Sequence, residues 1–175
     1  MRDLPDSAAR NVEIKARIDD VRSLASKAAA IATEGPVELL QDDAFFHCAH
    51  GRLKLRVSPG ADAELIFYRR ADSQGPRESF YLRVPVSAPD ELRAALSFAC
   101  GPMGRIRKRR TLYLVGRTRI HLDEVDGLGH FVELEVVMAP GEPLEDGVRE
   151  AHELMDKLGI RPSQLIEGAY VDLLA

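Results

Sequence analysis

Residues 10–17 read RNVEIKAR, and their side chains alternate between apolar and polar or charged. In a strand, successive side chains point to opposite faces, so Val12, Ile14 and Ala16 would line one surface while Glu13 and Lys15 share the other. The same alternation recurs in GRLKLRV (51–57), AELIFYRR (63–70), RIRKRRTLYLV (105–115), TRIHLDEV (118–125) and HFVELEVVM (130–138). A charged strand face therefore repeats along most of the chain.

Length and composition favour one globular domain over residues 1–175, because 45% hydrophobic content at this length can bury a sizeable core. The net charge of −4 argues against binding nucleic acid through the whole surface. Cys48 and Cys100 lack zinc-ligand spacing and are compatible with a reducing compartment. The sequence shows neither the apolar run of a signal peptide nor the ~20 apolar residues of a membrane span. We expect a soluble, cytoplasmic protein with no membrane or nucleic-acid partner.

Capping signals predict three main helices, two between these strands and one after the last of them. Asp19 and Asp20 precede a helical pattern over 21–32 that Gly35-Pro36 would stop. Ser87 would open a second helix ending at Gly101-Pro102. A third helix runs from 145 to Gly159, and a short one begins near 162–163. Short, turn-rich spacers favour antiparallel neighbours, so the sequence predicts an α+β fold: an antiparallel eight-stranded barrel or tunnel with flanking helices, because closure removes exposed strand edges.

The charged faces fit two interpretations, a solvated outer surface or the lining of the barrel. They carry very few Ser, Thr, Asn or Gln side chains, which favours the lining. The inward set would then hold seven cations and four carboxylates: Lys15, Lys54, Arg56, Arg70, Lys108, Arg110 and Arg119 against Glu13, Asp123, Glu133 and Glu135. Like charges repel strongly in an enclosed space, so this lining predicts a bound polyanion.

Carboxylates on the same face add a second expectation. Glu133 and Glu135, facing Glu13, supply oxygen ligands that suit Mg²⁺ or Mn²⁺. Arginine offers planar forks to phosphate oxygens, and lysine offers a point charge. A divalent cation beside a polyanion indicates a phosphate chain as the ligand.

Several stretches together resemble the CYTH superfamily, which contains class IV adenylyl cyclases and thiamine triphosphatases, with the closest resemblance to its cyclase-like bacterial branch. They are NVEIK, GRLKLR, LIFYRR, RKRRTLYLVG, RIHLDEVDGLGHFVELE and GAYVDLL. The resemblance implies an eight-stranded antiparallel tunnel, a triphosphate substrate and a need for Mg²⁺ or Mn²⁺. It also implies roles for individual residues: metal binding by Glu13, Glu133 and Glu135 with Asp123 nearby, and phosphate binding by Lys15, Lys54, Arg56, Lys108, Arg110 and Arg119.

Two positions depart from the family pattern. Asn11 stands where the motif usually has its first Glu, which implies one metal-site carboxylate fewer. Tyr68 stands where tripolyphosphatase members place a lysine that helps to activate water, which weakens the implication of hydrolysis.

The leading functional hypothesis is cyclisation of ATP to cyclic AMP and pyrophosphate. Lys15, Arg56, Lys108 and Arg110 are the expected catalytic residues, and Lys54, Tyr68, Arg70 and Arg119 complete the expected substrate-binding set. The alternatives are hydrolysis of tripolyphosphate or thiamine triphosphate, and a binding module without turnover. A homodimer stays an open alternative.

Other candidates each have an ordinary explanation. RIRKRR (105–110) could be a nucleic-acid patch, but alternation sends Lys108 to one face and Arg107 to the other, which favours the tunnel. His47 to His50 could bind zinc, although no other soft ligand accompanies them. His121 could carry a proton or be a neutral wall residue. Tyr170 could close over the tunnel or pack the terminal segment, and packing is slightly favoured.

Overall fold

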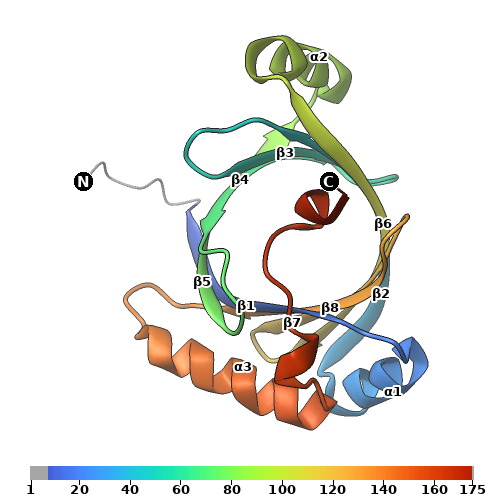
Figure 1. Ribbon diagram of the computed structural model, residues 1–175, viewed down its shortest axis with the longest axis vertical. Helices are drawn as coiled ribbons and strands as arrows, with labels where there is room; N and C mark the ends of the chain where they lie inside the picture. Colours follow the sequence, from blue (N-terminus) through green and yellow to red (C-terminus); the bar gives the residue numbers. More distant parts are fainter. Residues whose placement is uncertain (1–7, 175) are drawn as a thin grey trace.

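The structure is a computed structural model that describes residues 8–174 (Figure 1). Within these residues the chain forms eight strands, three α-helices and two short 3-10 helices. They are β1 (Ala9–Arg17), α1 (Val21–Ile31), β2 (Glu34–Phe46), β3 (Arg52–Val57), β4 (Ala63–Arg70), β5 (Arg77–Val86), α2 (Pro89–Cys100), β6 (Pro102–Val115), β7 (Thr118–Val125), β8 (Gly129–Val137), α3 (Leu144–Leu158), η1 (Pro162–Gln164) and η2 (Tyr170–Leu174).

The strands form a closed barrel in the order β1-β5-β4-β3-β2-β6-β7-β8. Every neighbouring pair is antiparallel, and β1 closes the ring by pairing with both β5 and β8. The predicted α+β fold with an eight-stranded antiparallel barrel is therefore confirmed. Closure gives every strand one face toward the interior of the barrel and one face toward the outside.

The apolar faces of β1, β7 and β8 point outward and are covered by helices α1 and α3 (Figure 1). Ile14, Leu134 and Ile120 of the barrel wall belong to one buried cluster with Leu24 of α1 and Leu158 of α3. Burying such side chains contributes roughly 1.5–3 kcal/mol each, so this cluster stabilises the orientation in which the charged faces look inward. Helix α2 lies against β2 and β3 on another side of the barrel and buries no residue completely.

Helix boundaries agree with the sequence in part. Asp20 caps α1 by accepting a hydrogen bond from the Ser23 backbone N–H at 2.9 Å, and Gly159 ends α3 with φ of 73°, both as predicted. Gly35-Pro36 does not stop α1, because β2 already begins at Glu34. The N-cap of α2 is Ala88, without a side-chain cap, so the prediction that Ser87 opens this helix was wrong by one residue.

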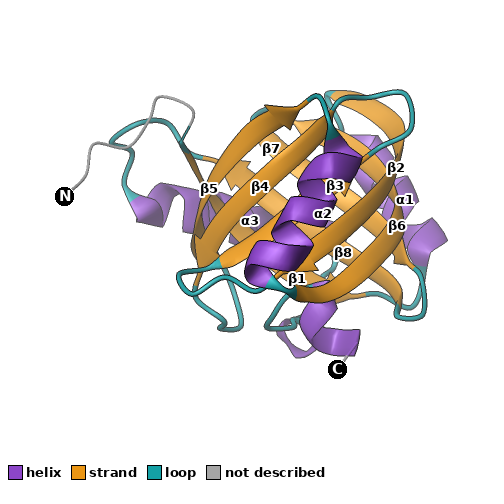
Figure 2. Cartoon of the chain, turned by 90° about the horizontal axis from the view of Figure 1, so that it is seen from above, coloured by secondary structure: helices purple, strands orange, loops and turns teal. Residues whose placement is uncertain are grey.

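The C-terminal residues 166–174 lie across one end of the barrel (Figures 1 and 2). Tyr170 and Val171 of this segment pack with Phe45, Ile106 and Phe131 in a buried apolar cluster. The Gly168 carbonyl accepts a hydrogen bond from Arg70 Nη2 at 2.6 Å, which ties the segment to the wall. The predicted tunnel is therefore covered at this end and resembles a pocket.

None of the helices within residues 8–174 combines the length and apolar character that crossing a membrane requires.

Candidate functional site

The barrel encloses a cavity of about 300 Å³, lined by side chains from all eight strands and from the C-terminal segment. Every site residue that the sequence predicted lies on this lining, with the exception of Asp123. The predicted residues on the lining are Glu13, Lys15, Lys54, Arg56, Tyr68, Arg70, Lys108, Arg110, Arg119, Glu133 and Glu135. The side chains of Arg83 and Arg119, toward the end away from the C-terminal segment, are 46% and 31% exposed, so the cavity opens there.

The cavity carries a strong excess of positive charge. Eight lysine and arginine side chains and four carboxylates line it, which leaves a formal excess of four positive charges. Arg83 and Asp43 belong to this lining although the sequence did not single them out. Charges of one sign in a water-poor cleft focus the field and attract a ligand of opposite charge.

Glu133 joins two of the expected phosphate-binding residues. Its carboxylate contacts Lys15 Nζ at 2.8 Å and accepts a hydrogen bond from Arg110 Nη2 at 2.7 Å. Burial alone would raise the pKa of Glu133, but Lys15 and Arg110 hold that pKa well below its usual value. Burial, followed by the neighbouring Arg70, lowers the pKa of Lys15, although Glu133 opposes this change.

The other two carboxylates on this side of the barrel are also paired. Glu13 accepts a hydrogen bond from Arg70 Nη1, and Glu135 contacts Arg119 Nη1 and His121 Nε2, each at 3.3 Å. Glu13 and Glu135 are directly opposite on the paired strands β1 and β8. Three carboxylates on two adjacent strands thus face the same cavity, each held by a cationic or imidazole partner.

Burial determines the state of His121 in this cluster. It lowers the pKa of the imidazole, with a further decrease from Arg110, and Glu135 only partly opposes these effects. His121 is therefore neutral at neutral pH, as expected of a polar wall residue.

Asp123 has a different environment from the three glutamates. Its side chain is fully buried and accepts hydrogen bonds from Arg110 at 2.6 Å and from the Tyr170 hydroxyl at 2.8 Å. Lys108 Nζ lies 3.4 Å away. Burial would raise the pKa of Asp123, but Arg110 and Lys108 lower it to about 2. The structure thus places Asp123 where it orients Arg110, Lys108 and Tyr170, and not on the cavity lining.

Tyr170 both packs and lines the cavity, so the preference for packing alone was incomplete. Its ring lies 4.9 Å from that of Phe131, centroid to centroid. The same ring faces Lys15 Nζ, 3.7 Å from the centroid, and Lys108 Nζ at 5.0 Å. The C-terminal segment therefore contributes a wall to the charged cavity, with cation–π contacts to two of the lysines.

The sequence did not identify Asp43, which lies on β2 on the far side of the cavity from the glutamates. It is 1% exposed and binds both Lys54 and Arg56. Odd-numbered residues of β2, among them Leu39, Gln41 and Phe45, line the cavity with it. Both faces of this strand mix apolar and polar side chains, so a two-residue period could not select the inner one. The register of β2 against β3 was the missing information.

The residues that we expected to bind a metal ion have suitable donor atoms, but they are not arranged as a preformed metal site. Across residues 8–174, no group of three His, Cys, Asp or Glu side chains is arranged to hold a metal ion, and this includes the stretch from His47 to His50. Glu13, Glu133 and Glu135 nevertheless supply the hard oxygen donors that Mg²⁺ and Mn²⁺ prefer. Because each is paired with a cation or imidazole, these carboxylates fit a divalent ion only if those partners move to another anion.

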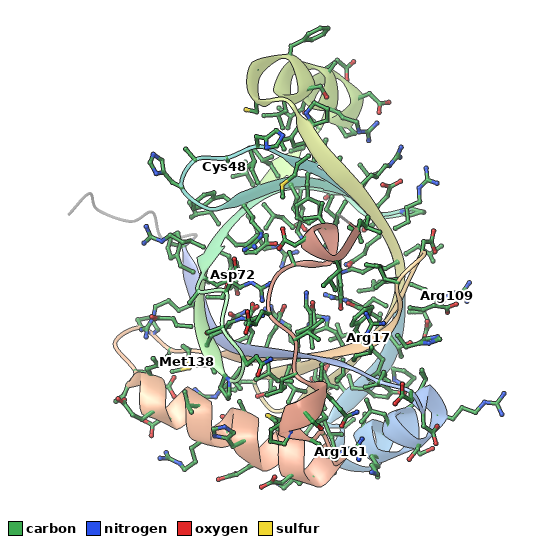
Figure 3. All side chains as sticks on the ribbon, in the orientation of Figure 1. Arg17, Cys48, Asp72, Arg109, Met138 and Arg161 are labelled. Atoms are coloured by element: carbon green, nitrogen blue, oxygen red, sulfur yellow. The ribbon has the colours of Figure 1, made fainter. Side chains whose placement is uncertain are left out.

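The outer face of β6 shows that its basic run is divided between two environments. Lys108 and Arg110 are buried in the barrel, whereas the side chain of Arg107 is 59% exposed. Figure 3 shows Arg109 pointing away from the barrel. The predicted alternation is confirmed, and it leaves only part of RIRKRR available on the outer surface.

Comparisons with known proteins agree with this architecture. The model of the CYTH domain family matches residues 9–170. Adenylate cyclase CyaB of Aeromonas hydrophila is 26% identical over 168 residues, which cover 91% of this chain and 85% of that protein.

Two solved structures show the same fold. The PH1012 protein of Pyrococcus horikoshii OT3 has a TM-score of 0.84 at 19% identity and covers 93% of this chain and 98% of its own. A candidate adenylate cyclase of Vibrio parahaemolyticus has a TM-score of 0.75 at 18% identity, with 95% and 98% covered. With a family match over nearly its whole length and a barrel of this kind, the chain belongs to the CYTH family.

Proposed function

We propose that the protein binds a triphosphate in the barrel and converts ATP to cyclic AMP and pyrophosphate with the help of Mg²⁺ or Mn²⁺. The observation that carries this proposal is the excess of four positive charges in the cavity, beside three carboxylates on adjacent strands. The likeness to an adenylate cyclase of Aeromonas hydrophila supports the choice of reaction.

The basic residues on two walls would bind the phosphate chain. Lys54 and Arg56 approach from β3, and Lys108 and Arg110 approach from β6. Their charges stabilise the negative charge that develops on the leaving pyrophosphate. The organic part of the substrate would lie toward the open end, where Tyr81 also lines the cavity.

Cyclisation requires one bond to form and one to break. The ribose 3′-oxygen attacks the α-phosphorus, the bond from that phosphorus to the bridging oxygen of the β-phosphate breaks, and the hydroxyl proton passes to solvent. Holding the phosphates rigidly brings the hydroxyl into line for this attack. Lys15, Arg56, Lys108 and Arg110 are the residues that we assign to this task, with Tyr68, Arg70 and Arg119 completing the wall.

Glu13, Glu133 and Glu135 would hold the divalent ion, which when bound neutralises charge on the phosphate oxygens. Phosphate oxygens can replace these carboxylates as partners of Lys15 and Arg110, which frees oxygen ligands. Asp123 remains bound to Arg110 and Tyr170 and acts by orienting them.

A turnover panel tests the proposal. Purified protein is incubated with ATP, tripolyphosphate or thiamine triphosphate, with Mg²⁺ or Mn²⁺, and the products are identified. Cyclic AMP and pyrophosphate from ATP support the proposal. Orthophosphate release from any of the three would identify a hydrolase, and tight binding without any product would identify a binding module.

A further inference from the structure

Asp43 forms a cluster with two cations on the wall that faces the three glutamates across the barrel. Arg56 donates from Nε to Oδ1 and from Nη2 to Oδ2, each at 2.7 Å. Lys54 Nζ donates to Oδ2 at 2.9 Å. The carboxylate is thus bound by a two-pronged guanidinium and an ammonium, which is also how proteins bind a phosphate group.

The ionised state of this carboxylate follows from its neighbours. Burial would raise the pKa of Asp43, but Lys54 and Arg56 hold it well below the usual value, so the group is an anion at neutral pH. Lys108 contributes in the same direction. The donors of Lys54 and Arg56 that face Asp43 are therefore occupied before any ligand arrives.

We propose that Asp43 is a positioning residue that acts as an internal counter-anion, holding Lys54 and Arg56 in place and competing with the phosphate that they bind. This rests on the proposed function in one respect, namely that the cavity takes a phosphate chain. Asp43 keeps the two cations oriented while the cavity is empty, and it weakens phosphate binding because a ligand must share or displace its contacts. Asp43 therefore favours release of the product pyrophosphate, because Lys54 and Arg56 bind Asp43 again when the product leaves.

This role predicts an unusual direction of change in ligand affinity when Asp43 is replaced. A residue that only supported the fold would weaken ligand binding when altered. Removing a competing negative charge beside the phosphate site should instead strengthen binding, while the loss of orientation should slow turnover. Coulomb attraction at these distances is large enough for an effect of at least about tenfold on the dissociation constant.

The test is calorimetric titration with sodium tripolyphosphate and with pyrophosphate in the absence of metal, below pH 7, where Lys54 is protonated. Asp43→Asn should bind both anions at least about tenfold more tightly than the wild type. Asp43→Glu keeps the charge and should stay within about threefold of the wild type. The matched control is Asp42→Asn, because Asp42 makes the same two-pronged contact on the outer surface, with Arg105 at 2.7 Å and 2.7 Å. Its affinity should not change.

Each outcome separates this inference from the proposed function. If the wild type binds neither anion, the proposed function fails. If the wild type binds them and Asp43→Asn binds equally or more weakly, the inference alone is overturned. Should Asp43→Asn not fold by itself, circular dichroism during the tripolyphosphate titration replaces calorimetry. Folding driven by the anion supports the inference, and an unfolded chain at saturating anion overturns it.

Discussion

Asp42 and Asp43 are adjacent in the chain but lie on opposite sides of the barrel wall. Asp42 binds Arg105 on the outer surface, and Asp43 binds Arg56 inside the cavity. The two contacts have the same chemistry and differ in burial, since the Asp43 side chain is 2% exposed and the Asp42 side chain is 28% exposed. This pair therefore separates the effect of the cavity from the effect of the ion pair itself.

We expect Asp43→Asn to lower the free energy of unfolding by about 3 kcal/mol in the absence of ligand, because it leaves two buried cations without their anion. Asp42→Asn should lower it by at most about 1 kcal/mol, since exposed ion pairs contribute little. Urea unfolding followed by circular dichroism measures both values. Equal losses in the two variants would show that the cavity does not make the difference.

Asp42 and Asp43 also show which inward-facing residues could be predicted from the sequence and which could not. The strands around Glu13, Lys54 and Glu133 have one apolar and one charged face, so a period of two assigned their inward residues correctly. Strand β2 has two mixed faces, and only its register with β3 shows that Asp43 points inward. Tyr170 was recognised as a candidate, but the sequence could not show that it both packs and lines the cavity, because this depends on where the C-terminal segment crosses the barrel.

Metal binding is the next property that a single variant can test. We expect Glu135→Gln to keep the fold but to lose divalent-cation dependence and to reduce turnover about 100-fold, consistent with several kcal/mol of charge stabilisation from a bound ion. Initial rates across a Mn²⁺ titration measure this. Glu124→Gln is the control, because the Glu124 side chain is exposed on the outside of β7, and this variant should behave as the wild type. Wild-type metal dependence in Glu135→Gln would remove Glu135 from the metal site.

Lys54 gives the cavity a pH dependence near neutrality. Burial and then Arg56 lower the pKa of this lysine to about 7, although Asp43 raises it; Lys108 adds a further decrease. The ring of Tyr68, which also faces the ammonium at 5.6 Å, is neutral because burial raises the pKa of its phenol. Below pH 7 Lys54 carries a charge that attracts phosphate, and above pH 7 it loses that charge.

Tripolyphosphate affinity should therefore fall as pH rises through about 7, and Lys54→Met should lack this part of the dependence. Subtracting the Lys54→Met affinity curve from the wild-type curve also removes the effect of protonating tripolyphosphate itself, because both proteins bind the same anion. Stability has the opposite sign: the unfolded chain keeps Lys54 protonated up to its ordinary pKa, so folding becomes more favourable between about pH 7 and pH 10. Parallel affinity curves for the wild type and Lys54→Met would contradict the assignment.

If the charged strand faces form an internal triphosphate site, two double variants of β6 should differ in a thermal-shift experiment. Lys108→Ala with Arg110→Ala removes two inward cations, whereas Arg107→Ala with Arg109→Ala removes two outward ones from the same strand. Tripolyphosphate with Mg²⁺ should raise the melting temperature of the wild type through linkage. The outward pair should keep nearly all of that increase, and the inward pair should lose most of it. An equal loss in both double variants would contradict the proposal that the triphosphate binds to the inward-facing cations.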